Sequence, residues 1–461
     1  MGDRHIAFAL NAQVMKKATP KKQSVVTMPL INPNAAGIDI GDTIHAVAVP
    51  EGRDLKRVKS FGTMTCDLQE IVGWLHQCEV ETVAMESTGI YWKPLFAMLV
   101  KDGFEVYLVN SKQARNVSGR KNDEDDAMWI QKLHSCGLLK SSYLPEDEQE
   151  SLRSLVRHRK TLILDRNRMV LRMQKAMEMM NIKLHTVIRD ITGKSGTAVI
   201  EAIIAGERTP ERFLQFMDRN IRADHATIVK SLQGNWRSEQ LYLLEDCYQS
   251  YRYYKERIAA CDKVIEQQLQ QYQAGLSSLI PSAQAKSTKQ ATKNKPSFNT
   301  CAYLKAILGV DVTAIFGLSD ITALEILSET GTDMSKWESS KHFVSWLNLC
   351  PNNKISGGKI ISSMLMKKKP NIASQAFRNA ANGAQRSDNW LGDYFRRMKA
   401  KGGNKYAMVA TANKIATIYY KMVLNKVEFN PPELQVYQQQ YKQAKITYLE
   451  RKLNELKKEV A

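Results

Sequence analysis

The sequence predicts an α/β domain near the N-terminus, a long helical region after it, and a mostly helical C-terminal domain. Three observations predict this order: short apolar runs between turns up to residue 147, heptad-spaced apolar residues from 148 to 275, and helical patterns beyond 301. A chain of 461 residues is long enough for two or three such domains. The expected segments are a basic extension (1–34), the α/β domain (35–147), a coiled-coil-like region (148–275), a Lys-rich linker (276–300), the C-terminal domain (301–430) and a final helix (431–461).

The α/β domain is predicted to begin with three short strands that can pair antiparallel. Helices and strands then alternate, because apolar residues at helical spacing separate the later buried runs. This layout is typical of a ribonuclease H-like domain. The expected strands are 36–40, 44–49, 55–61, 82–85 and 105–109, and the expected helices are 66–76, 91–100 and 123–138.

Four carboxylates in this domain are candidate metal ligands. Asp39 lies in a core strand, Glu86 follows another strand, and Asp123 and Asp126 lie three residues apart at the start of a helix. Two-metal sites need several carboxylates from different elements, and four like charges at close range are unfavourable without a cation. The alternative for Asp123 is an N-terminal helix acid that the helix dipole favours. Asp39 is harder to explain in this way, since an acid inside a core strand is unfavourable without a partner.

Composition favours a nucleic-acid partner and excludes a membrane-spanning protein. The excess of 66 Lys+Arg over 47 Asp+Glu gives a net charge of +19, which suits a polyanion. No apolar run approaches the roughly 20 residues that span a bilayer, and the N-terminus does not resemble a signal peptide. The seven scattered cysteines form no Cys-x-x-Cys pair and indicate reduced thiols. We therefore expect a cytoplasmic protein whose acid cluster acts on phosphodiesters.

The helical region carries apolar residues seven positions apart, as coiled coils do. Two interpretations are equally open, a helical hairpin that packs on itself and pairing between chains. The final helix can likewise form a short coiled coil or dock on the body of the chain. The heptad residues are Leu155, Leu162, Met169 and Ala176, then Leu244, Tyr251, Ile258, Ile265 and Tyr272, and in the final helix Ile446, Leu449, Leu453, Leu456 and Val460.

Two segments of the C-terminal domain are candidates for phosphate contact. Ser356 precedes two glycines in a loop followed by a short extended run, with Lys354 and Lys359 beside it. By residue type alone this segment is a turn. Lys367, Lys368 and Lys369 form a basic patch that suits the phosphate backbone, or a solvated basic face.

The segment 315–324 is similar to half of a helix-hairpin-helix, whose turn amides contact DNA phosphate. Phe316 and Ser319 stand where that motif usually has proline and glycine. A plain turn between helices is the alternative.

Taken in order, these segments resemble the DEDD-type insertion-sequence transposases, a family of bridge-RNA-guided serine recombinases. The resemblance runs from about residue 35 to 430. It is carried by Gly-Ile-Asp39, Glu86-Ser-Thr-Gly-Ile-Tyr-Trp, Arg120-Lys-Asn-Asp123-Glu-Asp-Asp126-Ala, and the segment from Pro351 through Ser356-Gly. It implies a RuvC-like N-terminal domain, a coiled-coil middle and a C-terminal transposase domain.

The resemblance also implies roles for individual residues. Asp39, Glu86, Asp123 and Asp126 would hold Mg²⁺, or Mn²⁺, and Ser356 would be the nucleophile that forms a covalent 5′-phosphoserine intermediate. The implied partners are the DNA of the donor ends and target, a non-coding guide RNA from the same element, and further copies of the chain in a dimer or tetramer. The implied location is the bacterial or archaeal cytoplasm.

Two other functions remain open from the sequence. A RuvC-like metal-dependent nuclease, such as a junction resolvase, would use activated water and would need the acids but not Ser356. A non-catalytic nucleic-acid-binding protein would keep its acids for structure. A covalent protein–DNA adduct that requires Ser356 distinguishes the recombinase from both.

Overall fold

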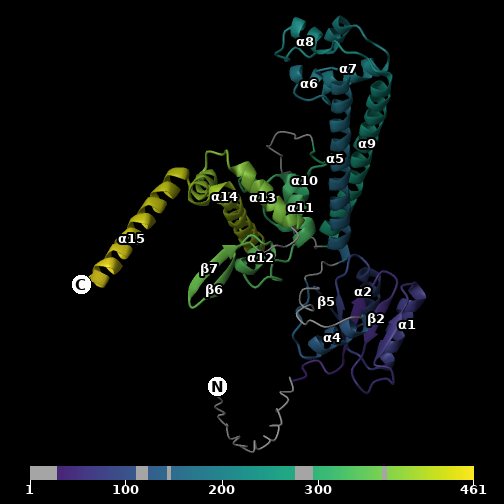
Figure 1. The fold of residues 1–461 in the computed structure, drawn as a ribbon. Helices are drawn as coiled ribbons and strands as arrows, with labels where there is room; N and C mark the ends of the chain where they lie inside the picture. Colours follow the sequence, from purple (N-terminus) through teal and green to yellow (C-terminus); the bar gives the residue numbers. More distant parts are fainter. Residues whose placement is uncertain (1–28, 111–122, 143–146, 276–293, 366–370, 461) are drawn as a thin grey trace, which may run out of the picture. The chain divides into compact units, whose positions relative to one another are not determined.

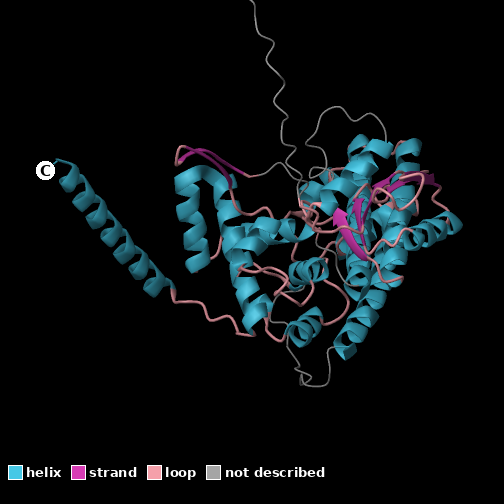
Figure 2. Ribbon diagram, turned by 90° about the horizontal axis from the view of Figure 1, so that it is seen from below, coloured by secondary structure: helices cyan, strands magenta, loops and turns pink. Residues whose placement is uncertain are grey.

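The computed structural model describes residues 29–110, 123–142, 147–275, 294–365 and 371–460 (Figure 1). The chain divides into two compact units, Met1–Leu144 and Pro145–Ala461. Strands in the described residues form a five-stranded sheet in the first unit and a two-stranded ribbon in the second, and helices make up most of the rest (Figure 2). None of the helices within these residues is long and apolar enough to cross a bilayer.

The first unit is built on a mixed sheet with strand order β3-β2-β1-β4-β5. The first three strands pair antiparallel, and β4 and β5 join them in parallel with β1. The bounds are β1 Ala35–Ile40, β2 His45–Ala48, β3 Val58–Phe61, β4 Thr82–Glu86 and β5 Glu105–Val109. The third strand was predicted from Leu55 but begins at Val58, since the Leu55 side chain is fully exposed and gains nothing from a place in the sheet.

Helices cover both faces of this sheet. On one face α1 (Thr65–Gln77) and α2 (Trp92–Lys101) pack their apolar residues on Ile38, Val47 and Met85. On the other face α4 (Asp123–Ser135) packs on the small residues Ala46, Ala48 and Ala84. Small side chains on that face let α4 lie close to the strands.

The second unit begins with a helical hairpin. The long helices α5 (Asp147–Met179) and α9 (Ser238–Gly275) lie side by side (Figure 1). Heptad residues of both helices, including Leu162, Met169, Leu244 and Ile258, are buried in the cores that the two helices share. The hairpin that packs on itself is therefore the interpretation that the structure supports for these seams.

A small helical cap joins the two long helices. It contains α6 (Leu184–Val187), α7 (Lys194–Ile204), the 3₁₀ helix η1 (Pro210–Phe216) and α8 (His225–Ser231). Ile200 and Phe213 of this cap pack with Met173 of α5 in one core.

The end of the predicted Lys-rich linker packs on the hairpin. Arg159 and Arg166 of α5 donate hydrogen bonds to Asn294, at 3.0 Å to its backbone oxygen and 2.6 Å to its side-chain oxygen. Phe298 is buried in the main core. Residues 294–299 are thus held in place, whereas residues 276–293 of the predicted linker lie outside the described residues.

The rest of the second unit is a helical domain with a projecting ribbon. Phe343, Phe377 and Tyr419 are fully buried in its core. Gly402 and Gly403 interrupt the longest helix of this domain with non-helical backbone angles. The elements are α10 (Thr300–Leu308), η2 (Val312–Ala314), α11 (Asp320–Thr330), α12 (Ser340–Trp346), β6 (Asn352–Ser356), β7 (Lys359–Met364), α13 (Ile372–Ala384), α14 (Trp390–Asn425) and α15 (Leu434–Val460).

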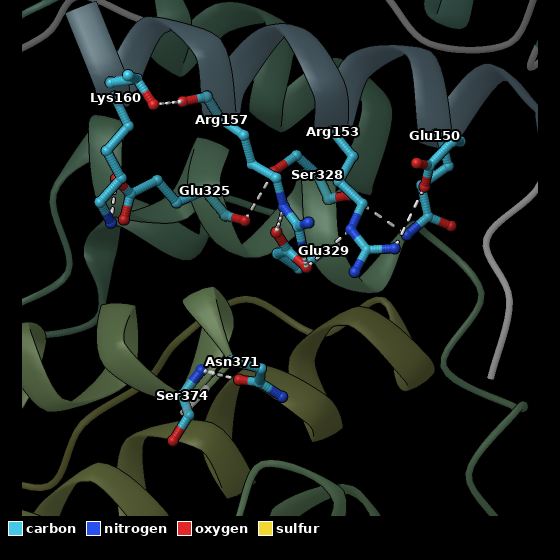
Figure 3. Close-up of polar contacts among 11 residues, drawn as sticks. Glu150, Arg153, Arg157, Lys160, Glu325, Ser328, Glu329, Asn371 and Ser374 are labelled. Carbon is cyan, nitrogen blue, oxygen red and sulfur yellow. Dashed lines mark hydrogen bonds and ion pairs between the residues drawn. The ribbon is translucent and has the colours of Figure 1, made fainter. Parts of the chain in front are cut away.

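Ion pairs connect the hairpin to this domain (Figure 3). Glu329 of α11 is buried and accepts two hydrogen bonds from Arg157 of α5, at 2.8 and 2.9 Å, with Arg153 3.0 Å away. One turn along, Lys160 lies 3.0 Å from Glu325. The two helices are therefore joined by matched charges as well as by apolar packing.

The segment 315–324 is a plain turn between helices. The Ser319 hydroxyl accepts a hydrogen bond from the Thr322 backbone at 3.2 Å and so caps α11. A Cβ atom at Gly317 would lie 2.2 Å from the backbone oxygen of Ala380 in α13. Because this turn packs against α13, the helix-hairpin-helix interpretation is not supported.

Candidate active-site residues in the two units

The sheet brings Asp39 and Glu86 together. Ile38 of β1 pairs with Met85 of β4, and continuing this parallel register by one residue puts Asp39 beside Glu86 at the carboxyl ends of both strands. Side chains alternate along a strand, so both acids lie on the face that α4 covers, opposite the core around Ile38 and Met85.

Helix α4 adds the other two acids. The Gln131 side chain donates to the Ala35 backbone oxygen at 3.1 Å, and a Cβ atom at Gly37 would lie 2.2 Å from the Gln131 backbone nitrogen. Moving along β1 from residue 35 to 39 therefore corresponds to moving back along α4 toward its N-terminus. The exposed Asp123 and the half-buried Asp126 lie there.

The four acids share one electrostatic environment. The pKa of Asp39 is raised to about 6, first by burial and then by the negative charges of Glu86, Asp123 and Asp126. A cation at this position would relieve that repulsion, and an all-carboxylate donor set suits Mg²⁺ or Mn²⁺. In the described part of the chain, no group of three or more His, Cys, Asp or Glu side chains converges closely enough to hold a metal ion. The metal site therefore stays a prediction.

Ser356 lies at the tip of the ribbon in the second unit. It is the last residue of β6 and pairs with Lys359, the first residue of β7. Gly357 and Gly358 both have positive φ angles, 54° and 76°, as a two-residue type I′ hairpin turn requires. The sequence predicted a loop before Ser356, but residues 352–356 form a strand because they pair with β7.

The tip is open and offers no base to the serine. Ser356 is exposed, and its hydroxyl makes no hydrogen bond within the described residues. A Cβ atom at Gly357 or Gly358 would meet nothing within 4 Å. The serine can therefore be approached freely, and whatever activates it must come from outside the ribbon.

Charge and apolar surface flank the serine on the ribbon. Lys354 and Lys359 are exposed, and so are the side chains of Ile355, Ile360 and Ile361. A two-stranded ribbon of this kind fits the major groove of DNA. The predicted patch Lys367, Lys368 and Lys369 lies outside the described residues.

One residue important for the acid cluster was missed from the sequence. Gly37 has no side chain, and this allows α4 to cross β1 closely, which brings the acids of its first turn near enough to raise the pKa of Asp39. The signal was present as a glycine two positions before the acid, on the same face of the strand.

Two parts of the chain match models of known protein families. Residues 36–182 match the IS110-type DEDD family, described as a transposase, and residues 311–396 match the transposase family IS116/IS110/IS902. The first match contains the four acids, and the second contains Ser356. Among curated proteins, none matches the sequence.

Proposed function

Because the chain belongs to the IS110-type DEDD transposases, we propose that it cleaves and rejoins DNA strands through a covalent bond between Ser356 and a DNA 5′-phosphate. The observation that carries this proposal is the exposed, unpartnered serine at the tip of a basic ribbon. A serine in a structural turn would usually bond to its own backbone.

The first unit is proposed to be a ribonuclease H-like, RuvC-type domain. Its strand order β3-β2-β1-β4-β5, with three antiparallel strands followed by two parallel ones, supports this assignment. So does the position of acids at the carboxyl ends of β1 and β4 and at the start of α4.

Asp39, Glu86, Asp123 and Asp126 are proposed to hold Mg²⁺ or Mn²⁺. Such an ion would polarise the phosphate and stabilise the leaving 3′-oxygen. The raised pKa of Asp39, caused by its burial and its acidic neighbours, supports a site built for a cation.

The proposed reaction makes and breaks one bond at phosphorus in each step. The Ser356 oxygen attacks phosphorus, its proton leaves to water, and the bond from phosphorus to the 3′-oxygen breaks. One DNA end is then a free 3′-hydroxyl and the other is joined to Ser356. Attack by a 3′-hydroxyl on this phosphoserine reverses the changes, so strands rejoin without ATP. Lys354 and Lys359 are proposed to hold the DNA backbone beside the serine.

The partners are proposed to be DNA and a guide RNA from the same element, in the bacterial or archaeal cytoplasm. The net charge of +19 supports polyanionic partners.

A dimer or tetramer is proposed as well. The heptad seams of α5 and α9 are already used within the chain, whereas Ile446, Leu449, Leu453 and Leu456 of α15 are exposed at heptad spacing. A second copy of α15 would bury them. Sedimentation of a chain ended at residue 433 should then show a smaller assembly than the full chain.

Covalent capture tests the catalytic proposal. Protein, guide RNA, Mg²⁺ and matched DNA are incubated, denatured and examined for DNA that stays joined to protein. Wild type should give an adduct, and Ser356→Ala and Glu86→Ala should each lose it, while Ser362→Ala on the same ribbon keeps it. If the DNA is cleaved without an adduct, and this cleavage persists in Ser356→Ala but is lost in Glu86→Ala, the chain is instead a hydrolytic nuclease.

A further inference from the structure

A cavity of about 580 Å³ lies at the base of the ribbon that carries Ser356. Its wall contains Ser363 of the ribbon, Pro351 just before the ribbon, Arg378 of α13, and residues of α14 on both sides of its glycine break. This volume is within the roughly 300–1,000 Å³ of small-ligand sites.

The cavity is positively charged. Arg378 and Lys405 line it, and none of its lining residues is acidic. The Arg378 side chain donates one 3.4 Å hydrogen bond to the Asn348 backbone, and its buried Nε has no partner. Neither cation forms an ion pair with any residue that the structure describes. Arg378 is partly buried, and a partly buried cation without a counterion is unfavourable. Lys405 is exposed and adds positive charge to the same wall, so the pair indicates an anionic ligand.

Two aromatic side chains line the same cavity. Tyr394 and Tyr406 lie on either side of the glycine break in α14, and neither hydroxyl has a hydrogen-bond partner in the described ranges. Tyr406 is exposed and its ring packs on Gly402, where a Cβ atom would lie 2.7 Å from Cγ of that ring. Aromatic rings beside cations suit a nucleotide, whose base stacks while its phosphate is paired.

The distance to the serine is short enough for one DNA strand to reach both. Ser363, in the wall of the cavity, pairs with Asn353, three residues before Ser356. Three strand residues span about 10 Å, and successive nucleotides of one duplex strand rise about 3.4 Å each. The cavity therefore lies about three nucleotides from the attacked phosphate.

We propose that this cavity binds one nucleotide of the DNA strand that Ser356 attacks, with its phosphate on Arg378 and Lys405 and its base against Tyr394 and Tyr406. The assignment of the strand depends on the proposed function, but binding in the cavity does not need the serine. The bound nucleotide would fix the strand relative to the ribbon tip.

Photo-cross-linking of the Ser356→Ala chain tests this without strand cleavage. A single-stranded oligodeoxythymidine carrying 4-thiothymidine is bound, irradiated, and the cross-linked residues are mapped by mass spectrometry. We expect cross-links at Tyr394 or Tyr406. Arg378→Gln and Lys405→Gln should each lower their yield roughly tenfold, whereas Lys401→Gln, an exposed cation that does not line the cavity, should not.

The outcomes separate this proposal from the catalytic one. The proposal would be overturned if bound DNA cross-linked only to residues outside the cavity. It would also be overturned if Lys401→Gln lowered the cross-linking yield as much as Arg378→Gln and Lys405→Gln. Stronger cross-linking of both tyrosines by 4-thiouridine RNA would overturn it in favour of the guide RNA. Cross-links in the cavity together with no covalent adduct in the wild-type capture assay would keep the binding site and reject the serine mechanism. Circular dichroism melting of each variant shows that lost cross-links do not come from unfolding.

Discussion

At the scale of single residues, Asp39 carries a free-energy cost that its neighbours explain. It lies on a strand whose flanking residues are buried, and its pKa is raised to about 6 by burial and by three other acids. At neutral pH the ionised carboxylate is therefore less stable in the folded chain than in the unfolded chain. Folded proteins keep such costs mainly where function requires them.

Asp39→Asn should stabilise the first unit at pH 7 in the absence of divalent metal. We expect the free energy of unfolding to rise by about 1 kcal/mol, which is less than the full pKa shift would give because the side chain is partly exposed. Hydrogen exchange of β1 and β4 amides measures this locally, which suits a chain of two units better than one melting curve. The same variant should lose the covalent adduct. Asp42→Asn, in an exposed turn, is the control, and equal stabilisation by both would show that the acid cluster is not the cause.

His134 gives the same unit a dependence on acid pH. Burial lowers the pKa of this histidine to about 4. The Thr82 hydroxyl donates to the Glu105 backbone oxygen at 3.0 Å, so it accepts from His134 Nε2 at 2.9 Å. With its pKa at about 4, the ring is neutral at pH 7.

Between pH 6.5 and 4 the unfolded chain binds a proton at His134 and the folded chain does not, so stability should fall as pH falls through this range. The loss is on the order of 2 kcal/mol, and His134→Gln should remove most of it. Asp39 acts in the opposite sense, because its raised pKa means that the folded chain binds the proton first. Exchange of β4 and β5 amides should therefore be followed in the Asp39→Asn background. The exposed His76→Gln is the control, and a slope unchanged by His134→Gln would contradict the assignment.

At the scale of elements, the sequence predicts those whose pattern is local. The five strands and three helices that the structure describes in the first unit follow apolar periodicity closely. Asp39, Asp123 and Asp126 lie on the predicted elements, whereas Glu86, which was predicted to follow a strand, is the last residue of β4. The ribbon was missed in part because β6 is exposed throughout and has no apolar alternation to indicate a strand. The packed segment 294–299 was hidden for a different reason: its order comes from Arg159 and Arg166, more than 120 residues earlier in the chain.

The cavity beside the ribbon could not be predicted from the sequence for the same reason, because its lining residues are far apart along the chain. Arg378 and Lys405 could not be paired from the sequence, since no spacing in the sequence brings α13 and the second half of α14 together. The glycine pair at 402–403 is the one local signal, because it interrupts an otherwise continuous helix.

The joint between α5 and α11 depends on Glu329 (Figure 3). Glu329→Gln should lower the stability of the C-terminal helices by about 2 to 3 kcal/mol, because Arg157 and Arg153 lose their buried anion. The loss stays below that of a fully buried pair since both arginines are partly exposed. Hydrogen exchange of α11 measures it. Glu325→Gln breaks only the pair with Lys160 and should cost less than about 1 kcal/mol, and an equal effect of both variants would contradict this ranking.

At the scale of the whole molecule, the two halves of the proposed site belong to different units. The acids lie in Met1–Leu144 and Ser356 lies in Pro145–Ala461. In the proposed mechanism each half needs the other, since the serine has no hydrogen-bonded base among the described residues and the metal-holding acids lie in the first unit. The proposed mechanism would therefore need one unit to meet the other, either within a chain or between chains.

Mixing two inactive variants distinguishes these arrangements. Ser356→Ala keeps the acids, and Glu86→Ala keeps the serine. If the serine of one chain acts at the acids of another, a mixed assembly contains one complete site, and adduct should appear on the Glu86→Ala chain alone. A size tag on one variant identifies that chain in a denaturing gel. If the site forms within one chain, neither variant has a complete site and the mixture gives no adduct.

We expect adduct in the mixture, at a yield set by the share of mixed assemblies. This expectation follows from an oligomer held by the exposed face of α15, and it makes a second prediction about the same mixture. Ending both variants at residue 433 should abolish the recovered adduct if α15 joins the chains, while leaving DNA binding by each variant intact. Recovery that persists without α15 would place the contact between chains elsewhere. If the wild-type chain forms the adduct but the mixture of the two variants does not, the serine of each chain acts at the acids of the same chain.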